Sequence, residues 1–167
     1  IWRTLLIPNT ITLDNLHLVL QIAMGWTNSH LHQYVSGQEI YSLPDDEFDY
    51  DFEIKDESQF KVSQLLKKEK DTIQYEYDFG DGWLHKIVLE KILPFDASTT
   101  LPCCIRGKRN CPPEDCGGIW GYNELLETLQ DPSHPEYQEL TEWLGEEFDP
   151  EYFNIKEINQ ILVEYCS

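Results

Sequence analysis

The chain has 167 residues, of which 41% are hydrophobic and 13% aromatic, a composition typical of a packed globular domain rather than a disordered chain. We therefore expect a single domain over residues 1–167. The 31 acidic and 12 basic residues give a formal net charge of −19, which repels nucleic-acid phosphates and anionic membranes. This charge argues against direct nucleic-acid binding and suits a cation or a basic partner. No apolar run approaches the ~20 residues that a membrane span needs.

The five cysteines are an odd number and include the adjacent pair Cys103 and Cys104, unlike the disulfide framework of a secreted protein. Reduced thiols and a cytoplasmic location are therefore the expectation. No signal peptide is visible, although Ile1 is an unusual first residue. We expect the first strand, Trp2–Ile7, to be truncated and to have a partner strand before it in the full-length protein.

The hydrophobic periodicity predicts an α+β domain: a mainly antiparallel sheet with a central aromatic hairpin, packed by an N-terminal helix and a C-terminal helical region. The clearest helix, Leu13–Met24, follows a capping Thr12 and ends at Gly25. The acidic segment 45–57 has apolar residues at alternate positions, which is consistent with an edge strand or a loop. Other elements are expected at His30–Tyr34 and Glu39–Leu43 (strands), Ser63–Lys68 (short helix), Tyr122–Gln130, Pro135–Leu144 and from Asn154 onward (helices), with Cys103–Tyr122 irregular.

The central hairpin is predicted over Ile73–Leu89, with aromatic residues on both arms. A three-residue loop, Gly80–Gly82, places those aromatic residues on one face, and its last glycine supplies a positive φ. The expected cross-strand pairs are Phe79–Trp83, Tyr77–His85, Tyr75–Ile87 and Ile73–Leu89 on the aromatic face, and Glu76–Lys86 on the other.

Three histidines form a first candidate site. His30 and His32 are two positions apart on a predicted strand, so both imidazoles project to the same side, as metal sites require. His85 lies on the aromatic face of the hairpin. If the strands are neighbours, the three converge with Glu114 or Asp115 on a divalent metal. The alternative is that His32 and His85 are hydrogen-bonded core residues.

Four cysteines form a second candidate site, for zinc: Cys103, Cys104, Cys111 and Cys116. Thiolates suit zinc, and the segment contains the glycines and prolines of tight metal-binding turns. The spacing differs from the usual paired C-x₂-C signature, so free thiols are the alternative.

The segment 112–121 is a third candidate site. Two prolines stiffen its start, and two glycines permit backbone conformations that other residues avoid. Glu114 and Asp115 lie between them, with Trp120 nearby. Such a loop either presents two carboxylates to a ligand or covers a sheet.

Several stretches together carry a family resemblance: I-W-R at 1–3, M-G-W-T-N-S-H-L-H-Q-Y at 24–34, Y-E-Y-D-F-G-D-G-W-L-H at 75–85, C-P-P-E-D-C-G-G-I-W-G-Y at 111–122 and F-D-P-E-Y-F-N at 148–154. With these the chain resembles the plasmid pRiA4b ORF-3-like family, also described as passenger proteins of IS1096-type mobile elements. The resemblance spans nearly the whole chain. It implies an α+β fold and a bacterial or archaeal protein, but no particular chemistry. The nucleophilic serine, flanking arginines and basic region of a serine resolvase are not found.

The main functional hypothesis is a non-catalytic binding module, with no cofactor, that holds a protein or peptide partner in a groove between the hairpin and the 111–122 loop. The alternative is a metal-dependent, hydrolase-like enzyme that holds its ion through His30, His32, His85 and a carboxylate. A DNA-transaction accessory protein is a third hypothesis, which the mobile-element context suggests and the charge opposes. The binding candidates are Trp26, Asp78, Asp81, Trp83, His85, Glu114, Asp115 and Trp120.

The loop and the hairpin are expected to meet, because a segment without its own helix or strand must cover something. The aromatic hairpin tip is the apolar surface that would otherwise be exposed. We therefore expect Asp78, Asp81, His85, Glu114 and Asp115 to lie near one another.

We predict that the isolated domain does not bind duplex DNA at physiological salt, because affinity for random duplex comes mainly from phosphate neutralisation and the net charge is −19. An electrophoretic mobility shift assay with random duplex checks this. A salt-sensitive shift at micromolar protein would contradict the prediction and support the mobile-element hypothesis.

Overall fold

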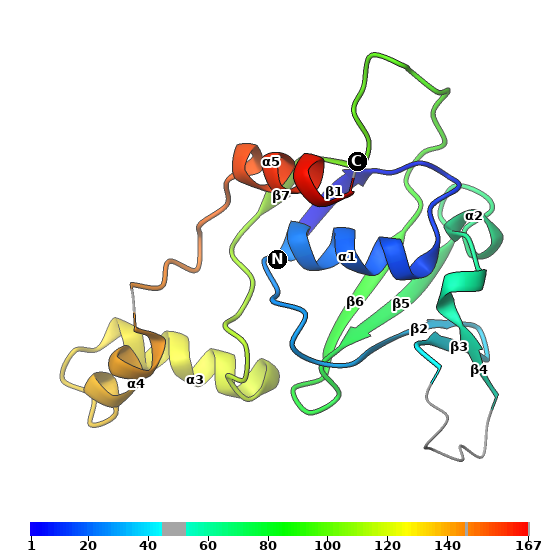
Figure 1. Cartoon of the computed structure of the whole chain (residues 1–167). Coiled ribbons are helices and arrows are strands. Elements are labelled where there is room, and N and C mark those ends of the chain that lie inside the picture. The colour runs from blue at the N-terminus through cyan, green and yellow to red at the C-terminus, as the bar shows by residue number, and fades with distance from the viewer. Residues whose placement is uncertain (45–52, 146, 167) are drawn as a thin grey trace.

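The computed structural model describes residues 1–44, 53–145 and 147–166, and its elements form an α+β fold (Figure 1). Within these residues a five-stranded sheet has the order β4-β3-β2-β5-β6, antiparallel except where β4 pairs with β3. Strands β1 and β7 form a separate antiparallel pair. The elements are β1 (Trp2–Leu6), α1 (Leu13–Met24), β2 (His32–Ser36), β3 (Glu39–Ser42), β4 (Ile54–Asp56), a 3₁₀ turn η1 (Glu57–Gln59), α2 (Val62–Leu65), β5 (Thr72–Tyr77), β6 (Trp83–Val88), β7 (Cys103–Lys108), α3 (Gly118–Gln130), α4 (Tyr137–Leu144) and α5 (Ile155–Cys166).

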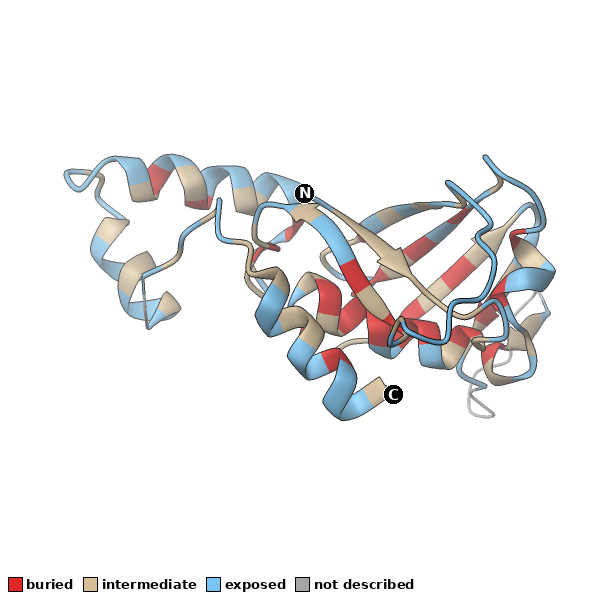
Figure 2. Cartoon of the chain, turned by 90° about the horizontal axis from the view of Figure 1, so that it is seen from above, coloured by how far each residue is buried: buried red, intermediate tan, exposed pale blue. Residues whose placement is uncertain are grey.

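Helix α1 lies across one face of the sheet, and buried residues concentrate between the two (Figure 2). Its bounds match the prediction, with Thr12 at the N-cap position and Gly25 in the left-handed conformation at its end. Leu13 and Leu16 share one buried cluster with Tyr34 and Tyr75, and both tyrosines are fully buried.

The remaining helices lie at the margins of this core. Helix α5 packs on β7 and α1, with Leu162 buried against Val19 and Cys104. Helices α3 and α4 pack on each other and extend away from the body of the molecule (Figure 1). None of the helices in the described part of the chain has the length and apolar character that crossing a membrane requires.

The predicted register of the central hairpin is wrong by two residues. The observed loop has five residues, 78–82, because Asp78 adopts a left-handed φ of 59° and its backbone carbonyl accepts from Gly82 N–H at 2.6 Å. A shift of two preserves the face of every side chain, and the expected positive φ at Gly82 is present, at 69°. The observed pairs are Tyr77–Trp83, Tyr75–His85 and Ile73–Ile87 on the aromatic face, with Glu76–Leu84 and Gln74–Lys86 on the other.

Two further expectations need correction. Within the described residues β1 pairs with β7, so the region 103–122 is not irregular throughout. Helix α3 also begins at Gly118 rather than Tyr122. The acidic segment forms an edge strand at Ile54–Asp56, and its residues 45–52 lie outside the described part of the chain.

A buried polar cluster fills the interface between α1 and the sheet. The rings of His17 and His32 stack with centroids 3.5 Å apart, and His32 Nε2 lies 2.9 Å from a carboxylate oxygen of the buried Glu57. His17 contacts the Tyr75 hydroxyl through Nδ1 at 2.8 Å and Asn28 Oδ1 through Nε2 at 2.7 Å. Because the Asn28 oxygen only accepts, neutral His17 carries its proton on Nε2 and accepts from Tyr75 at Nδ1.

Burial, and then the neighbouring His32, lower the pKa of His17 to about 4. The unfolded chain, with a histidine pKa near 6.5, therefore takes up a proton at a higher pH than the folded protein does. The stability that neutral His17 contributes is complete above about pH 6.5 and is lost as the pH falls towards 4.

We predict that His17→Gln is less sensitive than the wild type to acidification between pH 7.5 and 5. The wild type should lose about 2 kcal/mol more of its free energy of unfolding over this interval, because only its unfolded state gains the His17 proton. Urea unfolding at several pH values measures the difference. Parallel pH profiles for the two proteins would show that His17 is protonated in the folded state.

Candidate functional site

Asp78, at the end of β5, is turned towards the loop that follows β7. Its Oδ1 accepts from the backbone N–H groups of Gly80 and Asp81, at 3.0 and 3.3 Å. Its own N–H donates to the Leu31 carbonyl at 2.9 Å, which fixes the hairpin tip beside the segment leading into β2. The residue is 6% exposed, and its Oδ2 accepts no hydrogen bond from the described residues. Asp78 therefore directs one oxygen that accepts no hydrogen bond from the described residues away from its own turn.

The loop after β7 docks onto this hairpin tip, as expected. Gly117 N–H donates to Asp81 Oδ2 at 3.1 Å. Gly118 lies so close to the Asp81 carbonyl that a Cβ there would be 2.5 Å from its oxygen. Glu114 and Asp115 are thereby carried to the tip.

Glu114 is held by three donors on one carboxylate oxygen. Its Oε1 accepts from Thr27 N–H at 2.8 Å, Thr27 Oγ1 at 3.0 Å and the Tyr77 hydroxyl at 3.0 Å. The Tyr77 hydroxyl also accepts from Ser29 N–H at 3.0 Å. Burial is the main cause that raises the pKa of Tyr77 to about 12, so it remains a phenol and a donor at neutral pH.

His30 is the point on which the three segments converge. Its Nε2 lies 3.0 Å from Asp115 Oδ1, 3.6 Å from Asp78 Oδ2 and 3.8 Å from Glu114 Oε2. Both His30 Nε2 and Glu114 Oε2 are buried and lack a hydrogen-bond partner. One imidazole nitrogen thus faces three carboxylates, and in the described part of the chain no lysine or arginine forms an ion pair with them.

The spacing of these atoms suits a metal ion. One ligand atom from each of His30, Asp78 and Asp115 lies within 4.8 Å of the other two, and these three residues are the group found at this spacing among the described histidines, cysteines and acids. Two ligands that are each ~2.1 Å from one ion lie roughly 3 to 4 Å apart. The cluster therefore has the donor types of a divalent-cation site, and the separations of 3.6 and 3.0 Å from His30 Nε2 to Asp78 and Asp115 fall in this range.

The backbone around the cluster has an unusual conformation. Five non-glycine residues in the described part of the chain have a positive φ, and three of them border this cluster: Asn28 at 54°, Asp78 at 59° and Asp115 at 57°. Asparagine and aspartate tolerate this conformation better than other residues, but it still costs free energy. A concentration of strained backbone conformations in one place is typical of functional sites.

The structure does not bring the three candidate histidines together. His32 is paired with Glu57 beneath α1. His85 lies below the cluster: its Nδ1 contacts the carbonyls of Trp83 and Tyr75, and its Nε2 accepts from Trp26 Nε1 at 3.4 Å. Burial lowers the pKa of His85, in keeping with this acceptor role. Both histidines match the alternative of hydrogen-bonded core residues. Of the five expected neighbours, Asp78, Glu114 and Asp115 face His30, whereas Asp81 accepts from the loop at Gly117 and His85 lies outside the cluster.

His30 is the residue that the expected set of neighbours omitted. Its sequence signal is the H-x-H pattern, which predicts two ligands on one strand. Strand β2 begins at His32, so His30 precedes it and turns towards the hairpin tip.

The four cysteines do not form a zinc group among the described residues. Cys103 and Cys104 belong to β7, whereas Cys111 is buried near Gly25. Burial raises the pKa of Cys111 and of Cys116 to about 12, which keeps both thiols protonated. All five cysteines are free.

The candidate tryptophans divide into two kinds. Trp26 and Trp83 are 6% and 8% exposed, so they form a buried floor beneath the cluster rather than the wall of an open groove. Their ring centroids lie 5.6 Å apart, and Trp26 also packs on Tyr77. Trp120, on α3, is 84% exposed.

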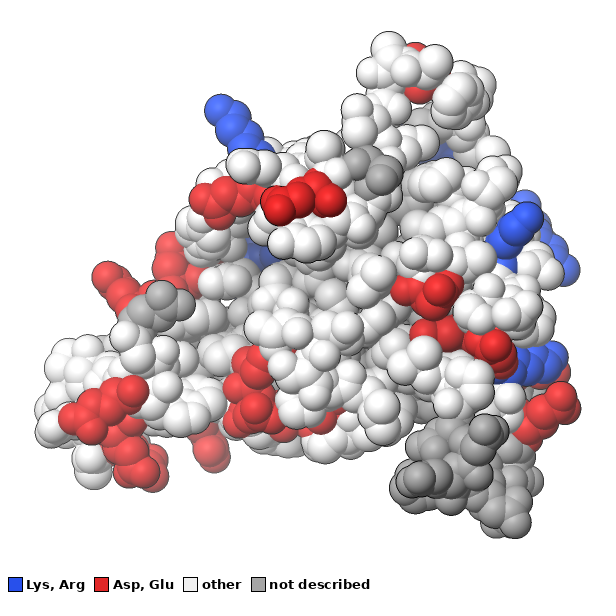
Figure 3. Space-filling model, in the orientation of Figure 1, with Lys and Arg blue, Asp and Glu red and all other residues white. Residues whose placement is uncertain are grey.

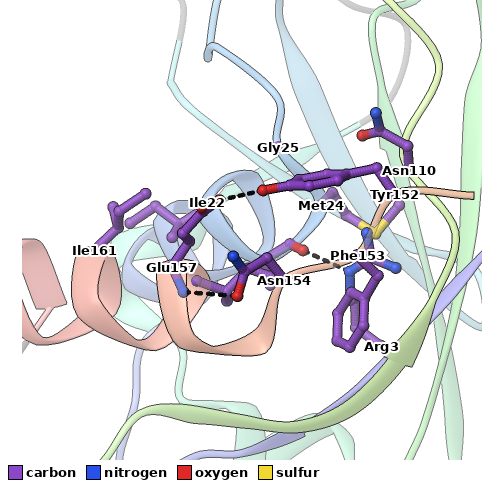
Figure 4. Close-up of a pocket in the computed structure, with 12 residues that line it drawn as sticks. Arg3, Ile22, Met24, Gly25, Asn110, Tyr152, Phe153, Asn154, Glu157 and Ile161 are labelled. Carbon is purple, nitrogen blue, oxygen red and sulfur yellow. Dashed lines mark hydrogen bonds between the residues drawn. The ribbon is translucent and has the colours of Figure 1, made fainter. Parts of the chain in front are cut away.

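A separate cavity of about 160 Å³ lies between the end of α1 and the start of α5 (Figure 4). Its main polar groups are already paired: Arg3 Nε donates to the Ala23 carbonyl at 2.7 Å, and the Tyr152 hydroxyl donates to Glu157 at 2.6 Å. The Arg3 guanidinium also lies over the Phe153 ring. We assign this cavity a packing role.

We predict that Gly118→Ala destabilises the protein more than Gly82→Ala, the matched control. Both glycines have a similar positive φ, 68° and 69°, so alanine costs about 1 kcal/mol at either from conformation alone. A Cβ at Gly82 meets no atom within 4 Å, whereas at Gly118 it would lie 2.5 Å from the Asp81 oxygen and displace the loop. Denaturant unfolding measures both. Equal losses would show that the loop does not depend on this contact.

The chain matches known proteins over nearly its full length. The family model for the plasmid pRiA4b ORF-3-like protein matches residues 1–157. The uncharacterized protein y4hQ of Sinorhizobium fredii (strain NBRC 101917 / NGR234) is 39% identical over 161 residues, 96% of this chain and 82% of y4hQ. The crystal structure of MM3350, a protein of unknown function from Methanosarcina mazei Go1, is similar with a TM-score of 0.81 and 38% identity, over 93% of this chain and 88% of that chain. The chain therefore belongs to the plasmid pRiA4b ORF-3-like family, as its sequence motifs predicted.

Proposed function

We propose that the protein is a metal-binding module in which His30, Asp78 and Asp115 hold a divalent transition-metal ion at the tip of the β5–β6 hairpin. The observation that carries this proposal is the buried, unpartnered Nε2 of His30, which faces carboxylate oxygens at 3.0 to 3.8 Å. Carboxylates crowded together without a counter-charge destabilise one another. A bound cation relieves this repulsion and gives the imidazole nitrogen a bonding partner.

The donor set favours some metals over others. Magnesium and calcium prefer oxygen ligands throughout, and thiolate sites favour softer metals. One imidazole with carboxylates suits zinc, manganese, iron or cobalt in the divalent state. Three protein ligands leave coordination positions free for an exogenous ligand.

A protein or peptide partner is part of the proposal. Ile119 and Trp120 are 62% and 84% exposed and directly follow Gly118, which contacts the hairpin tip, so apolar side chains lie beside the ion site. Acidic side chains outnumber basic ones on the visible face of the molecule, which favours a basic partner (Figure 3). The five free cysteines support a reducing, cytoplasmic location. We assign no DNA-binding role from the plasmid in the family description, because the charge opposes it.

A metal-dependent hydrolase is the second candidate function. Its supporting observation is Glu114, a further carboxylate whose Oε2 lies 3.8 Å from His30 Nε2 without a hydrogen-bond partner. The ligand set of this enzyme differs from the sequence-based hypothesis, because His32 and His85 are committed to other contacts.

We predict that protein purified without a histidine tag and stripped with a chelator binds Zn²⁺ or Co²⁺ with 1:1 stoichiometry. His30→Ala and Asp115→Asn should each weaken the affinity by about 100-fold or more, because each removes a ligand. At a free-ion concentration about 100 times the dissociation constant, the wild type should gain about 2.7 kcal/mol of stability. Isothermal titration calorimetry and thermal unfolding measure these effects.

The control is His134→Ala, in the turn between α3 and α4, which should bind metal as the wild type does. Absence of stoichiometric binding in the wild type would contradict the proposal. His30 would then serve only as the ion-pair partner of the three carboxylates, and His30→Ala would destabilise the metal-free protein.

A further inference from the structure

We propose that Glu114 is not a ligand of the ion but the hydrogen-bond acceptor for a neutral ligand that occupies a free coordination position. The chemical class of that ligand is one whose coordinating oxygen or nitrogen carries a hydrogen, such as water or an amine. This inference rests on the proposed metal site at His30, Asp78 and Asp115, and it names what the ion binds there.

The first argument is that Glu114 cannot rotate freely. Its Oε1 accepts from Thr27 N–H, Thr27 Oγ1 and the Tyr77 hydroxyl, all within 3.0 Å. Tyr77 is fully buried and Thr27 N–H belongs to the backbone, so both donors are fixed. The orientation of the carboxylate is therefore set by the fold rather than by an ion.

The second argument is the position of the other oxygen. Glu114 Oε2 is buried without a partner and lies 3.8 Å from His30 Nε2, yet Glu114 is not part of the group whose ligand atoms lie within 4.8 Å of one another. An ion bound at the centre of that group would have Glu114 Oε2 next to its coordination sphere. A small ligand on the ion can bridge this gap by donating a hydrogen bond.

The third argument is charge. With three carboxylates around one divalent ion, the site is negative when His30 is neutral, and in the described part of the chain neither lysine nor arginine is paired with these carboxylates. The Glu114 carboxylate repels an anionic ligand that carries no hydrogen. The same carboxylate attracts a neutral ligand that donates a hydrogen bond to it.

The test uses Glu114→Gln, because the three donors dictate how glutamine must orient. The amide oxygen stays on the side of Thr27 and Tyr77, and the amide NH₂ then faces the ion, so an acceptor becomes a donor. Co²⁺-loaded protein is titrated at mildly basic pH, at which most hydrazine is the neutral base, with hydrazine, which is rich in N–H groups, and with azide, which is anionic and has no hydrogen. The visible spectrum of Co²⁺ reports the binding of each probe.

We expect Glu114→Gln to keep its Co²⁺ affinity, to bind hydrazine about tenfold more weakly than the wild type, and to bind azide about tenfold more tightly. The control Glu127→Gln makes the same change at an exposed position on α3 and should alter neither probe. Thr27→Val removes the hydroxyl that donates to Glu114 Oε1. It should reduce the difference between the hydrazine and azide affinities without reversing the sign of that difference. Circular dichroism verifies that each variant is folded.

Three results would overturn the inference. A loss of Co²⁺ affinity in Glu114→Gln would make Glu114 a ligand. Unchanged affinities for both probes, or changes in the same direction, would show that Glu114 does not contact the bound ligand. If the wild type binds no Co²⁺, both the proposed metal site and this inference are wrong. If the wild type binds Co²⁺ but Glu114→Gln does not change the relative affinities for the two probes, only this inference is wrong.

Discussion

The site depends on the hydrogen bonds that Glu114 receives through a single oxygen. Thr27 follows α1, Tyr77 ends β5, and Glu114 belongs to a loop that is far from both in sequence. A charged acceptor makes each of these bonds stronger than a neutral pair would be. The loop is also attached to the hairpin tip through Asp81 and the glycines at 117 and 118, and Cys111 packs in the core.

The aromatic layer beneath the site makes this arrangement rigid. Tyr77 is fully buried and packs against Trp26, with ring centroids 5.2 Å apart, while its hydroxyl reaches Glu114. One side chain is therefore part of both the hydrophobic core and the polar cluster. The cluster is held on packed strands and on the end of α1, so it is preorganised without a bound ligand. This differs from small zinc domains, which obtain their fold from the metal.

Local signals in the sequence were sufficient to predict much of the fold. The bounds of α1 follow from leucines at helical spacing and a terminal glycine, and the shared face of the hairpin follows from strict alternation. The hairpin register was not predictable in this way, because Asp78 takes a left-handed conformation in which its side chain bonds to its own turn. Strand β7 was missed because its sequence, C-C-I-R-G-K, lacks alternation and its partner β1 is about a hundred residues earlier.

Part of the site was also predictable from local signals in the sequence. A loop without its own secondary structure had to cover the hairpin tip, and that argument correctly placed Glu114 and Asp115 beside Asp78. It selected His85 as the neighbouring imidazole, because the predicted register pairs His85 with Tyr77, next to Asp78. In the observed register His85 pairs with Tyr75 and contacts Trp26, and His30 is the imidazole that lies beside Asp78.

The free-energy cost of forming this cluster in the folded protein is the strongest reason to regard it as functional. Three residues around it hold a positive φ, two buried polar atoms lack partners, and its carboxylates have one imidazole among them. Each of these features opposes folding, and the buried polar cluster beneath α1 shows that this chain satisfies buried polar groups elsewhere. Trp83 Nε1 is the other buried side-chain polar atom without a partner among the described residues. A fold that satisfies the polar cluster beneath α1 but leaves the cluster at His30 incomplete is consistent with a binding site, where a ligand would supply the missing bonds. The proposed cation, with an open coordination position, would supply both the charge and the bonds that this cluster lacks.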